Sequence, residues 1–221
     1  MAKEKFGFTL KNGETAAVNK LAFHKLQTGL FDDLSKANTK SYGHEIFEIC
    51  NLNYENETYL LDNHNDKGFK WGSIDTTKKV IGLNTGCGDR WVTRLWDIEN
   101  WSILAQKLME KGYFVLLLGG SQEHEKNVTI SERSGATYLG HFPLNKFINL
   151  INQCDLVVTQ VTMSMHLTIG LGKKIVLMNN IFNPNEFNLF DLGEIIEPPK
   201  PCECYYKGNC INGTSCMETI S

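Results

Sequence analysis

The chain has 221 residues, of which 42% are apolar and 21% are charged, and its 22 basic and 25 acidic side chains leave a formal charge of −3. This length and composition fit one globular domain or one and a half, and they exclude a collagen, a coiled coil or a disordered chain. The near-neutral charge argues against nucleic acid as a partner, and no apolar run approaches the roughly 20 residues that span a bilayer. We expect at most a peripheral membrane contact and, because the N-terminus lacks an apolar secretory stretch, a cytoplasmic location.

The first 75 residues are rich in polar connections and hold few regular elements. A hairpin is predicted within residues 6–18, because Asn12-Gly13 favours a tight turn between two strands. Helical segments are predicted at 20–26 and 41–50. This is too little apolar sequence for a second core of normal size. We therefore expect the end of a domain whose beginning is missing, or an extension that packs on the main domain.

Between about residues 78 and 197, short apolar runs alternate with amphipathic stretches, which is typical of βα units on a parallel sheet buried on both faces. Asp97 and Gly112 suit the two ends of one helix, Pro143 opens another, and Gly172 closes a third. These units predict a doubly wound, Rossmann-like α/β domain that binds its ligand at the carboxyl ends of the strands. The expected strands are 80–84, 113–118, 137–139, 156–159, 174–178 and 194–196.

Two of the strand ends carry residues that suit phosphate and ribose. After the first strand, the loop that contains Thr85 and Gly86 lets backbone N–H groups approach a phosphate, and Arg94 adds positive charge. A tight turn with solvated arginines is the alternative. Glu123, just past the second strand, is placed to accept hydrogen bonds from ribose hydroxyls, or else only complements the N-terminus of the next helix.

The strand at 156–159 leads into hydroxyls and backbone donors at a helix N-terminus, an arrangement that binds anions. Thr162 lies at this point, and His166 follows within the first turn as a ligand contact or an ordinary structural residue. Trp96 and Trp101 are candidates for base stacking. Packing between helix and sheet is the alternative for both, and it is favoured for Trp101, which lies on the apolar face of its helix.

Four of the seven cysteines lie in the last twenty residues with the spacing C-x-C-x5-C-x5-C. Cys202, Cys204, Cys210 and Cys216 suit one tetrahedral site for structural zinc or iron, because the glycines between them let the chain fold back around an ion. A reducing compartment favours thiolate ligands over disulfides. Disulfides and free thiols are the alternatives, and a structural role is expected because the cluster lies far along the sequence from the strand-end loops.

Three blocks of residues, in their order along the chain, resemble the C-terminal, donor-binding half of family 9 glycosyltransferases, the ADP-heptose:lipopolysaccharide heptosyltransferases. The residues that carry the resemblance are Arg94-Leu95-Trp96 with Trp101, Leu118-Gly119-Gly120 with Glu123, and Asp155-Leu156-Val157-Val158-Thr159 followed by Met165-His166-Leu167. The family has a GT-B fold of two Rossmann-like halves. The resemblance thus implies a remnant of the acceptor-side domain with its connector at 1–75, a nucleotide-sugar-binding domain at 76–197 and a cysteine-rich tail at 198–221.

For function, the resemblance implies transfer of a sugar from a nucleoside-diphosphate sugar, ADP-heptose first, to a cell-envelope glycan or another acceptor, as in lipopolysaccharide biosynthesis. The transfer step needs no metal, although some members of the family carry C-terminal cysteines and some of those bind one. A separate half would bind the acceptor, whether glycan, lipid or protein, so this chain alone is expected to bind a donor without efficient turnover. The alternative is a non-catalytic nucleotide-sugar-binding module or an assembly subunit.

The resemblance also implies roles for single residues, although it assigns no catalytic residue because the general base of the family lies in the acceptor half. In the loop before Met-His, this sequence has Val161 and Met163 where the family has Asp and Gly. Carried over by position, the donor contacts are Thr85 and Gly86 for the phosphates, Arg94 for the diphosphate charge, Glu123 for the ribose, Leu139 for the adenine, and Thr162 with His166 for the diphosphate and sugar.

Overall fold

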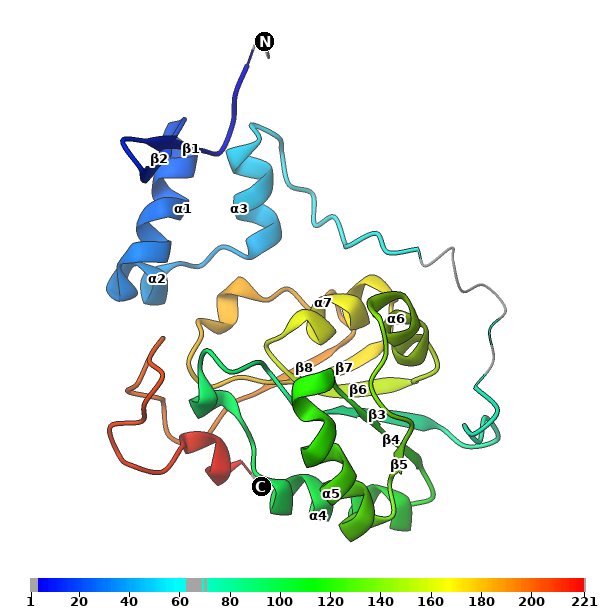
Figure 1. The fold of residues 1–221 in the computed structure, drawn as a ribbon. Coiled ribbons are helices and arrows are strands. Elements are labelled where there is room, and N and C mark those ends of the chain that lie inside the picture. The colour runs from blue at the N-terminus through cyan, green and yellow to red at the C-terminus, as the bar shows by residue number, and fades with distance from the viewer. Residues whose placement is uncertain (1–3, 63–68, 70, 221) are drawn as a thin grey trace. The chain divides into compact units, whose positions relative to one another are not determined.

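A computed structural model describes residues 4–62, 69 and 71–220 (Figure 1). The described chain divides into two compact units. The smaller contains residues up to Thr58 together with Phe182–Asn188, and the larger contains Tyr59–Ile181 and the chain from Leu189 onward. In the described residues, no helix combines the length and the apolar character that crossing a bilayer requires.

The smaller unit is a β-hairpin followed by three helices. Strands β1 (Phe8–Lys11) and β2 (Glu14–Ala17) pair antiparallel around Asn12 and Gly13, which both have positive φ. Asn-Gly favours this two-residue turn, so the predicted hairpin is confirmed. Two of the helices were predicted, although α1 continues beyond residue 26, and the short helix between them was not. The helices are α1 (Lys20–Leu30), α2 (Asp32–Ala37) and α3 (Tyr42–Ile49).

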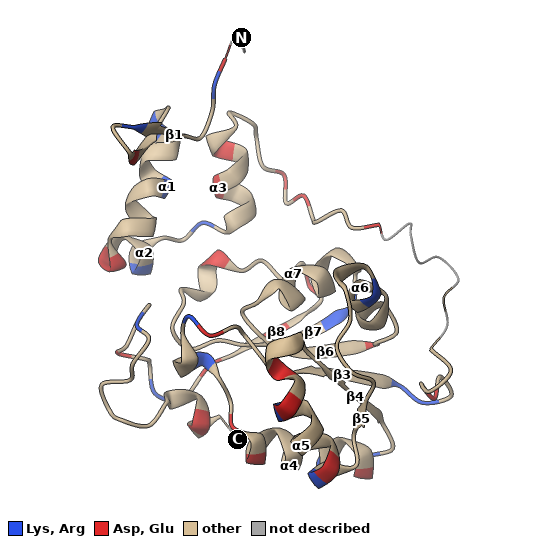
Figure 2. Ribbon diagram, in the orientation of Figure 1, with Lys and Arg blue, Asp and Glu red and all other residues tan. Residues whose placement is uncertain are grey.

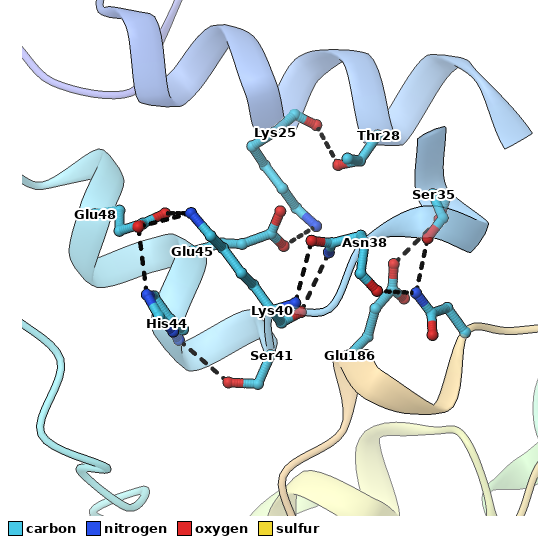
Figure 3. A network of polar contacts seen from close by, with 11 residues as sticks. Lys25, Thr28, Ser35, Asn38, Lys40, Ser41, His44, Glu45, Glu48 and Glu186 are labelled. Carbon is cyan, nitrogen blue, oxygen red and sulfur yellow. Dashed lines mark hydrogen bonds and ion pairs between the residues drawn. The ribbon is translucent and has the colours of Figure 1, made fainter. Parts of the chain in front are cut away.

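Polar contacts tie the elements of the smaller unit together (Figure 3). Lys25 Nζ of α1 lies 2.6 Å from Glu45 Oε2 of α3, and the Glu45 side chain is only 2% exposed. A carboxylate buried without such a partner would be strongly destabilising. Asn183 of the returning segment donates hydrogen bonds to the carbonyl oxygens of Ser35 at 2.7 Å and Asn38 at 2.6 Å. These bonds join the returning segment to α2.

The larger unit is built on a six-stranded parallel sheet with the order β5-β4-β3-β6-β7-β8 (Figure 1). The sequence predicted all six strands to within one residue at each end. Because β3 lies in the interior of the sheet, the strand order reverses between β3 and β6, and doubly wound sheets bind their ligands outside the carboxyl ends at such a point. The strands are β3 (Val80–Asn84), β4 (Phe114–Leu118), β5 (Thr137–Tyr138), β6 (Leu156–Gln160), β7 (Lys174–Met178) and β8 (Gly193–Ile196).

Two apolar cores cover the two faces of this sheet. One packs Trp101 of α4 and Ile130 of α5 against alternate residues of β3 and β4, and the other packs Leu150 of α6 and Leu167 of α7 against the opposite face. The strands carry few charged residues, whereas charges of both signs are scattered over α4 and α5 (Figure 2). The helices are α4 (Ile98–Glu110), α5 (His124–Ser134), α6 (Leu144–Asn152) and α7 (Met163–Gly170).

The ends of these helices follow the predicted capping residues. The Asp97 side chain accepts a hydrogen bond from the Asn100 backbone N–H at 2.6 Å, and Gly112 follows the end of α4 with φ +88°. Pro143 is the residue immediately before α6, and Gly172, with φ +65°, lies just after α7. A left-handed residue after a helix favours glycine, because a Cβ makes this conformation costly.

The cysteine-rich tail packs on the larger unit and ends in a short 3-10 turn, Cys216–Thr219. Within this turn Met217 is fully buried, and it joins the same core as Trp101 and Ile81. The tail is therefore anchored to the Rossmann-like sheet by apolar contact. The whole larger unit is an α/β, doubly wound parallel sheet, as the sequence predicted.

Candidate functional site

A cleft of about 470 Å³ opens at the carboxyl ends of β3, β4 and β6. The loops after these three strands form most of its lining, and Phe142, Leu144 and Phe147 add an apolar wall at the start of α6. Its place matches the reversal of strand order, and its volume is in the range of small-molecule sites in proteins. The cleft is therefore the candidate ligand site of the larger unit.

The loop after β3 lies so close to the Glu123 side chain, in the turn after β4, that a larger residue in place of Gly86 would force this side chain to move. Asn84 Nδ2 donates hydrogen bonds to the Gly86 carbonyl oxygen at 2.9 Å and to Thr159 Oγ1 at 3.1 Å, which ties the end of β3 to β6. A Cβ on Gly86 would lie 2.0 Å from Glu123 Oε1. Gly86 is buried, and it lines the cleft together with Asn84 and Cys87.

Arg94 brings a positive charge into the cleft. It lies in the 3-10 turn Val92–Arg94, is 7% exposed, and donates hydrogen bonds to the carbonyl oxygens of Cys87 and Val161. Burial lowers its pKa, but a guanidinium stays protonated in proteins because its ordinary pKa is so high. Arg94 therefore bridges the loops after β3 and β6 and offers a fixed cation to a ligand.

The cysteine-rich tail supports the turn that carries Arg94. The Thr93 carbonyl oxygen accepts hydrogen bonds from Ser215 Oγ at 2.6 Å and from Asn180 Nδ2 at 2.8 Å, and Thr93 Oγ1 donates to the Lys207 carbonyl oxygen at 3.1 Å. Through these contacts the tail stabilises the local structure of the turn. They also place it beside the cleft, which its distance along the sequence did not indicate.

Glu123 lies between the turn after β4 and the start of α5. It lies at the end of a 3-10 turn, Ser121–Glu123, that leads into α5, and its Oε2 accepts a hydrogen bond from the Gly120 backbone N–H at 2.8 Å. The side chain also lines the cleft. A carboxylate held in this way can complement the helix N-terminus and still accept a hydrogen bond from a ligand hydroxyl.

Lys126 of α5 is a residue that the sequence pattern gave no reason to single out. Its Nζ donates hydrogen bonds to the carbonyl oxygens of Thr85 and Trp96, both at 2.9 Å, and burial lowers its pKa. It holds the loop after β3 against the segment that precedes α4. A lysine on an amphipathic helix usually points into solvent, so only the three-dimensional arrangement identifies this contact.

The N-terminus of α7 faces the cleft. Thr162 is the N-cap residue, and its Oγ1 accepts a hydrogen bond from the Ser164 backbone N–H at 3.1 Å. Thr162, Met163 and Ser164 all line the cleft. The first turn of α7 holds no acidic residue, so the positive end of the helix dipole is not offset there.

Of the seven residues predicted to contact a donor, three do not line the cleft and four do. Thr85 is fully buried and its hydroxyl donates to Asn127 Oδ1 at 2.5 Å, while Leu139 packs against the core on the α6 side of the sheet. His166 lies outside the cleft lining, with its Nδ1 3.2 Å from the Tyr59 hydroxyl oxygen. The predicted residues that line the cleft are Gly86, Arg94, Glu123 and Thr162.

The tail cysteines occur as neighbouring thiols. All seven cysteines of the chain are free. The sulfur atoms of Cys204 and Cys210 lie 3.5 Å apart, and the Cys202 and Cys216 thiols are hydrogen-bonded neighbours. Within the described ranges, no group of three or more Cys, His, Asp or Glu side chains is arranged to hold a metal ion. The four-thiol metal site therefore stays a prediction.

Comparison with known proteins identifies what the chain is similar to. The family model for glycosyltransferase family 9 (heptosyltransferase) matches residues 22–188, and no curated protein matches the chain. The structure of E. coli ADP-heptose lps heptosyltransferase II is 24% identical with a TM-score of 0.50, over 56% of this chain and 40% of that one. E. coli heptosyltransferase WaaC with ADP-2-deoxy-2-fluoro heptose is 16% identical with a TM-score of 0.51, over 79% of this chain and 51% of that one.

A third similar structure is the iron-containing dodecameric glycosyltransferase TibC from enterotoxigenic E. coli. It is 14% identical with a TM-score of 0.57, over 82% of this chain and 50% of that one. At these identities the likeness concerns the fold. The chain spans about half of the length of these solved structures, or less.

Proposed function

The chain belongs to glycosyltransferase family 9, and we propose on that premise that it supplies the donor-binding half of an enzyme that transfers a sugar from a nucleoside-diphosphate sugar. One observation carries the proposal. The cleft at the carboxyl ends of β3 and β6 brings together a buried guanidinium, a helix N-terminus and glycine-rich loops. These are the groups that bind phosphate in proteins.

The diphosphate, the ribose and the base of such a donor each have a candidate contact in the cleft. Arg94 and the α7 N-terminus with Thr162 would hold the diphosphate, and Glu123 would accept hydrogen bonds from the ribose hydroxyls. The apolar wall that begins at Phe142 would contact the base. When the bond between sugar and phosphate breaks, positive groups near the departing diphosphate lower the barrier, and no metal is needed for that step.

ADP-heptose is the first candidate for the donor. One of the similar structures is an ADP-heptose lps heptosyltransferase, and another is a heptosyltransferase with ADP-2-deoxy-2-fluoro heptose. We propose a cell-envelope glycan as the acceptor, bound by a separate acceptor-binding half, with a cytoplasmic site of action.

Replacing Glu123 with alanine tests the donor site directly. We expect ADP to bind roughly tenfold more weakly, because hydrogen bonds from the ribose to a carboxylate are lost. Inorganic pyrophosphate, which has no ribose, should bind at least as well to this variant as to the wild type. Calorimetric titration with ADP-heptose, ADP, UDP, GDP and pyrophosphate measures both effects.

The matched control is Glu125→Ala, because Glu125 is an exposed carboxylate in the first turn of the same helix and does not line the cleft. This variant should keep the wild-type affinity. A wild-type chain that binds none of the nucleotides, or a Glu123→Ala variant that binds ADP as well as the wild type does, would contradict the donor-site proposal.

A non-catalytic nucleotide-sugar-binding module is the second candidate. It is favoured by Val161 and Met163, which line the cleft where the family has Asp and Gly, so that the loop after β6 has lost a carboxylate and gained bulk. Such a module would bind ADP-heptose tightly without releasing ADP, even with an acceptor-side half present. ADP release measured under these conditions separates the two candidates.

Separately, we propose that the four cysteines of the tail bind a structural zinc or iron ion. In its support, the 3.5 Å between the sulfur atoms of Cys204 and Cys210 is similar to the about 3.8 Å that separates two thiolates on one tetrahedral ion with metal–sulfur bonds of about 2.3 Å. The similar TibC structure is described as iron-containing. Since the described thiols do not form a set of three, the ion would draw the neighbouring pairs together.

Elemental analysis of protein purified without added metal tests the proposed metal site of the tail. We expect close to one equivalent of zinc or iron, a clear loss in Cys204→Ser, and no loss in Cys50→Ser, which alters an exposed thiol of the smaller unit. Less than about a tenth of an equivalent in the wild type, or an equal metal content in both variants, would contradict the proposal.

A further inference from the structure

Ser164 is a buried polar residue whose hydroxyl has no structural role among the described residues. It lies in the first turn of α7, is 3% exposed and lines the cleft. Its hydroxyl oxygen has no hydrogen-bond partner among the described residues. A buried hydroxyl without an acceptor is destabilising, so a ligand that accepts its hydrogen bond would recover that free energy.

The position of Ser164 in its helix explains why its hydroxyl lacks an intrahelical acceptor. Buried helical hydroxyls usually donate to the carbonyl oxygen four residues earlier. Ser102 does so to Ile98 at 2.7 Å, and Thr168 does so to the Ser164 carbonyl oxygen at 2.7 Å. Four residues before Ser164 lies Gln160, which ends β6 and is not helical. The first-turn position therefore leaves the hydroxyl available to a ligand.

The surroundings of this hydroxyl favour an anion as that ligand. The Ser164 backbone N–H is already bonded to Thr162 Oγ1, so the side chain is the available donor of this residue. The guanidinium of Arg94 binds the Val161 carbonyl oxygen at the entrance to the same turn. Together with the positive end of the helix dipole, it creates a positive potential on the cleft side.

We propose that Ser164 Oγ donates a hydrogen bond to a phosphate oxygen of a nucleoside diphosphate held between the α7 N-terminus and Arg94. The proposal rests on the proposed donor-binding function and adds to it a phosphate contact that the family resemblance did not indicate. The acceptor is a phosphate rather than a sugar hydroxyl, because Arg94 and the helix N-terminus both concentrate positive potential at this point.

The test compares Ser164→Ala with Ser102→Ala, two substitutions of the same chemistry in buried helical serines of the larger unit. Ser164→Ala is expected to bind ADP roughly five- to tenfold more weakly, with unchanged affinity for adenosine, which lacks the phosphates. Without ligand, its Tm should equal or exceed that of the wild type, because an unsatisfied buried hydroxyl is removed. Ser102→Ala should show the reverse, with unchanged ADP affinity and a lower Tm.

Calorimetry for ADP, ligand-observed NMR for adenosine and thermal unfolding provide the readouts. A wild-type chain that binds ADP while Ser164→Ala binds it equally well overturns the Ser164 proposal alone and leaves the donor site standing. Equal losses of ADP and adenosine affinity, accompanied by a lower Tm, overturn it as well, because they indicate a structural role. A wild-type chain that binds no ADP overturns both the proposal and the donor-binding function.

Discussion

Replacing Arg94 with alanine is expected to weaken ADP binding at least about tenfold. A hydrogen bond from a charged group contributes about 1.5–3 kcal/mol, and Arg94 is a buried guanidinium on the lining of the cleft. The substitution also removes the donor that joins the carbonyl oxygens of Cys87 and Val161, so the loops after β3 and β6 lose their bridge. Both effects weaken a diphosphate site.

Arg94→Lys separates these two effects, because lysine keeps the charge but cannot reproduce the planar bridge between two carbonyl oxygens. Its ADP affinity should lie between those of the wild type and Arg94→Ala. The control is Arg133→Ala, since Arg133 is 53% exposed on α5, forms an ion pair with the exposed Glu99 at 3.3 Å and does not line the cleft. Calorimetry with ADP measures the series, and circular dichroism confirms that each variant is folded. If Arg94→Ala binds ADP as tightly as Arg133→Ala does, Arg94 does not contact the phosphates.

Replacing Trp101 with alanine is expected to cost the larger unit about 3–5 kcal/mol of unfolding free energy. Trp101 is fully buried on the sheet side of α4, and its ring packs edge to face with that of Trp96, with 5.1 Å between centroids and 79° between planes. Removing a ring of this size leaves a cavity that the surrounding core does not fill. The loss is a large fraction of a typical domain stability of 5–15 kcal/mol.

Trp101→Phe is the informative control for that loss. The indole Nε1 of Trp101 is buried without a hydrogen-bond partner in the described structure, so phenylalanine keeps an aromatic ring and removes an unsatisfied N–H group. Its cost should be clearly smaller than that of alanine. Urea unfolding followed by circular dichroism measures both variants. Trp101 is not a core residue if alanine costs less than about 1 kcal/mol, or if the two substitutions cost the same.

Features that depend only on residues close together in the sequence were predictable from the sequence. The six strands stand out because strands of a parallel sheet are buried on both faces and read as short apolar runs. Asp97, Gly112 and the Asn12-Gly13 turn act through backbone geometry within a few residues, so their roles follow from residue type and spacing. The same reasoning placed Trp101 in the core.

Contacts between distant segments were not predictable in this way. Thr85 lies in the expected loop, but its hydroxyl turns inward to Asn127, which is far along the chain. His166 lies in the first turn of the expected helix but contacts the hydroxyl of Tyr59, and Lys126 donates hydrogen bonds to two carbonyl oxygens in other segments. Each outcome depends on which groups the fold brings within hydrogen-bonding distance.

By itself, the sequence determined the α/β class, the strand positions, most of the helix positions, the family and the three strand-end loops that line the cleft. Only the tertiary structure decided which residues of those loops face the cleft, that the cysteine-rich tail supports the turn of Arg94 through Thr93, and that Ser164 presents a hydroxyl with no acceptor in the described chain. The physical reason is the distance along the chain over which each effect acts. Backbone preferences and apolar periodicity act over a few residues, whereas burial and hydrogen-bond satisfaction depend on the packing of segments that are distant in the chain.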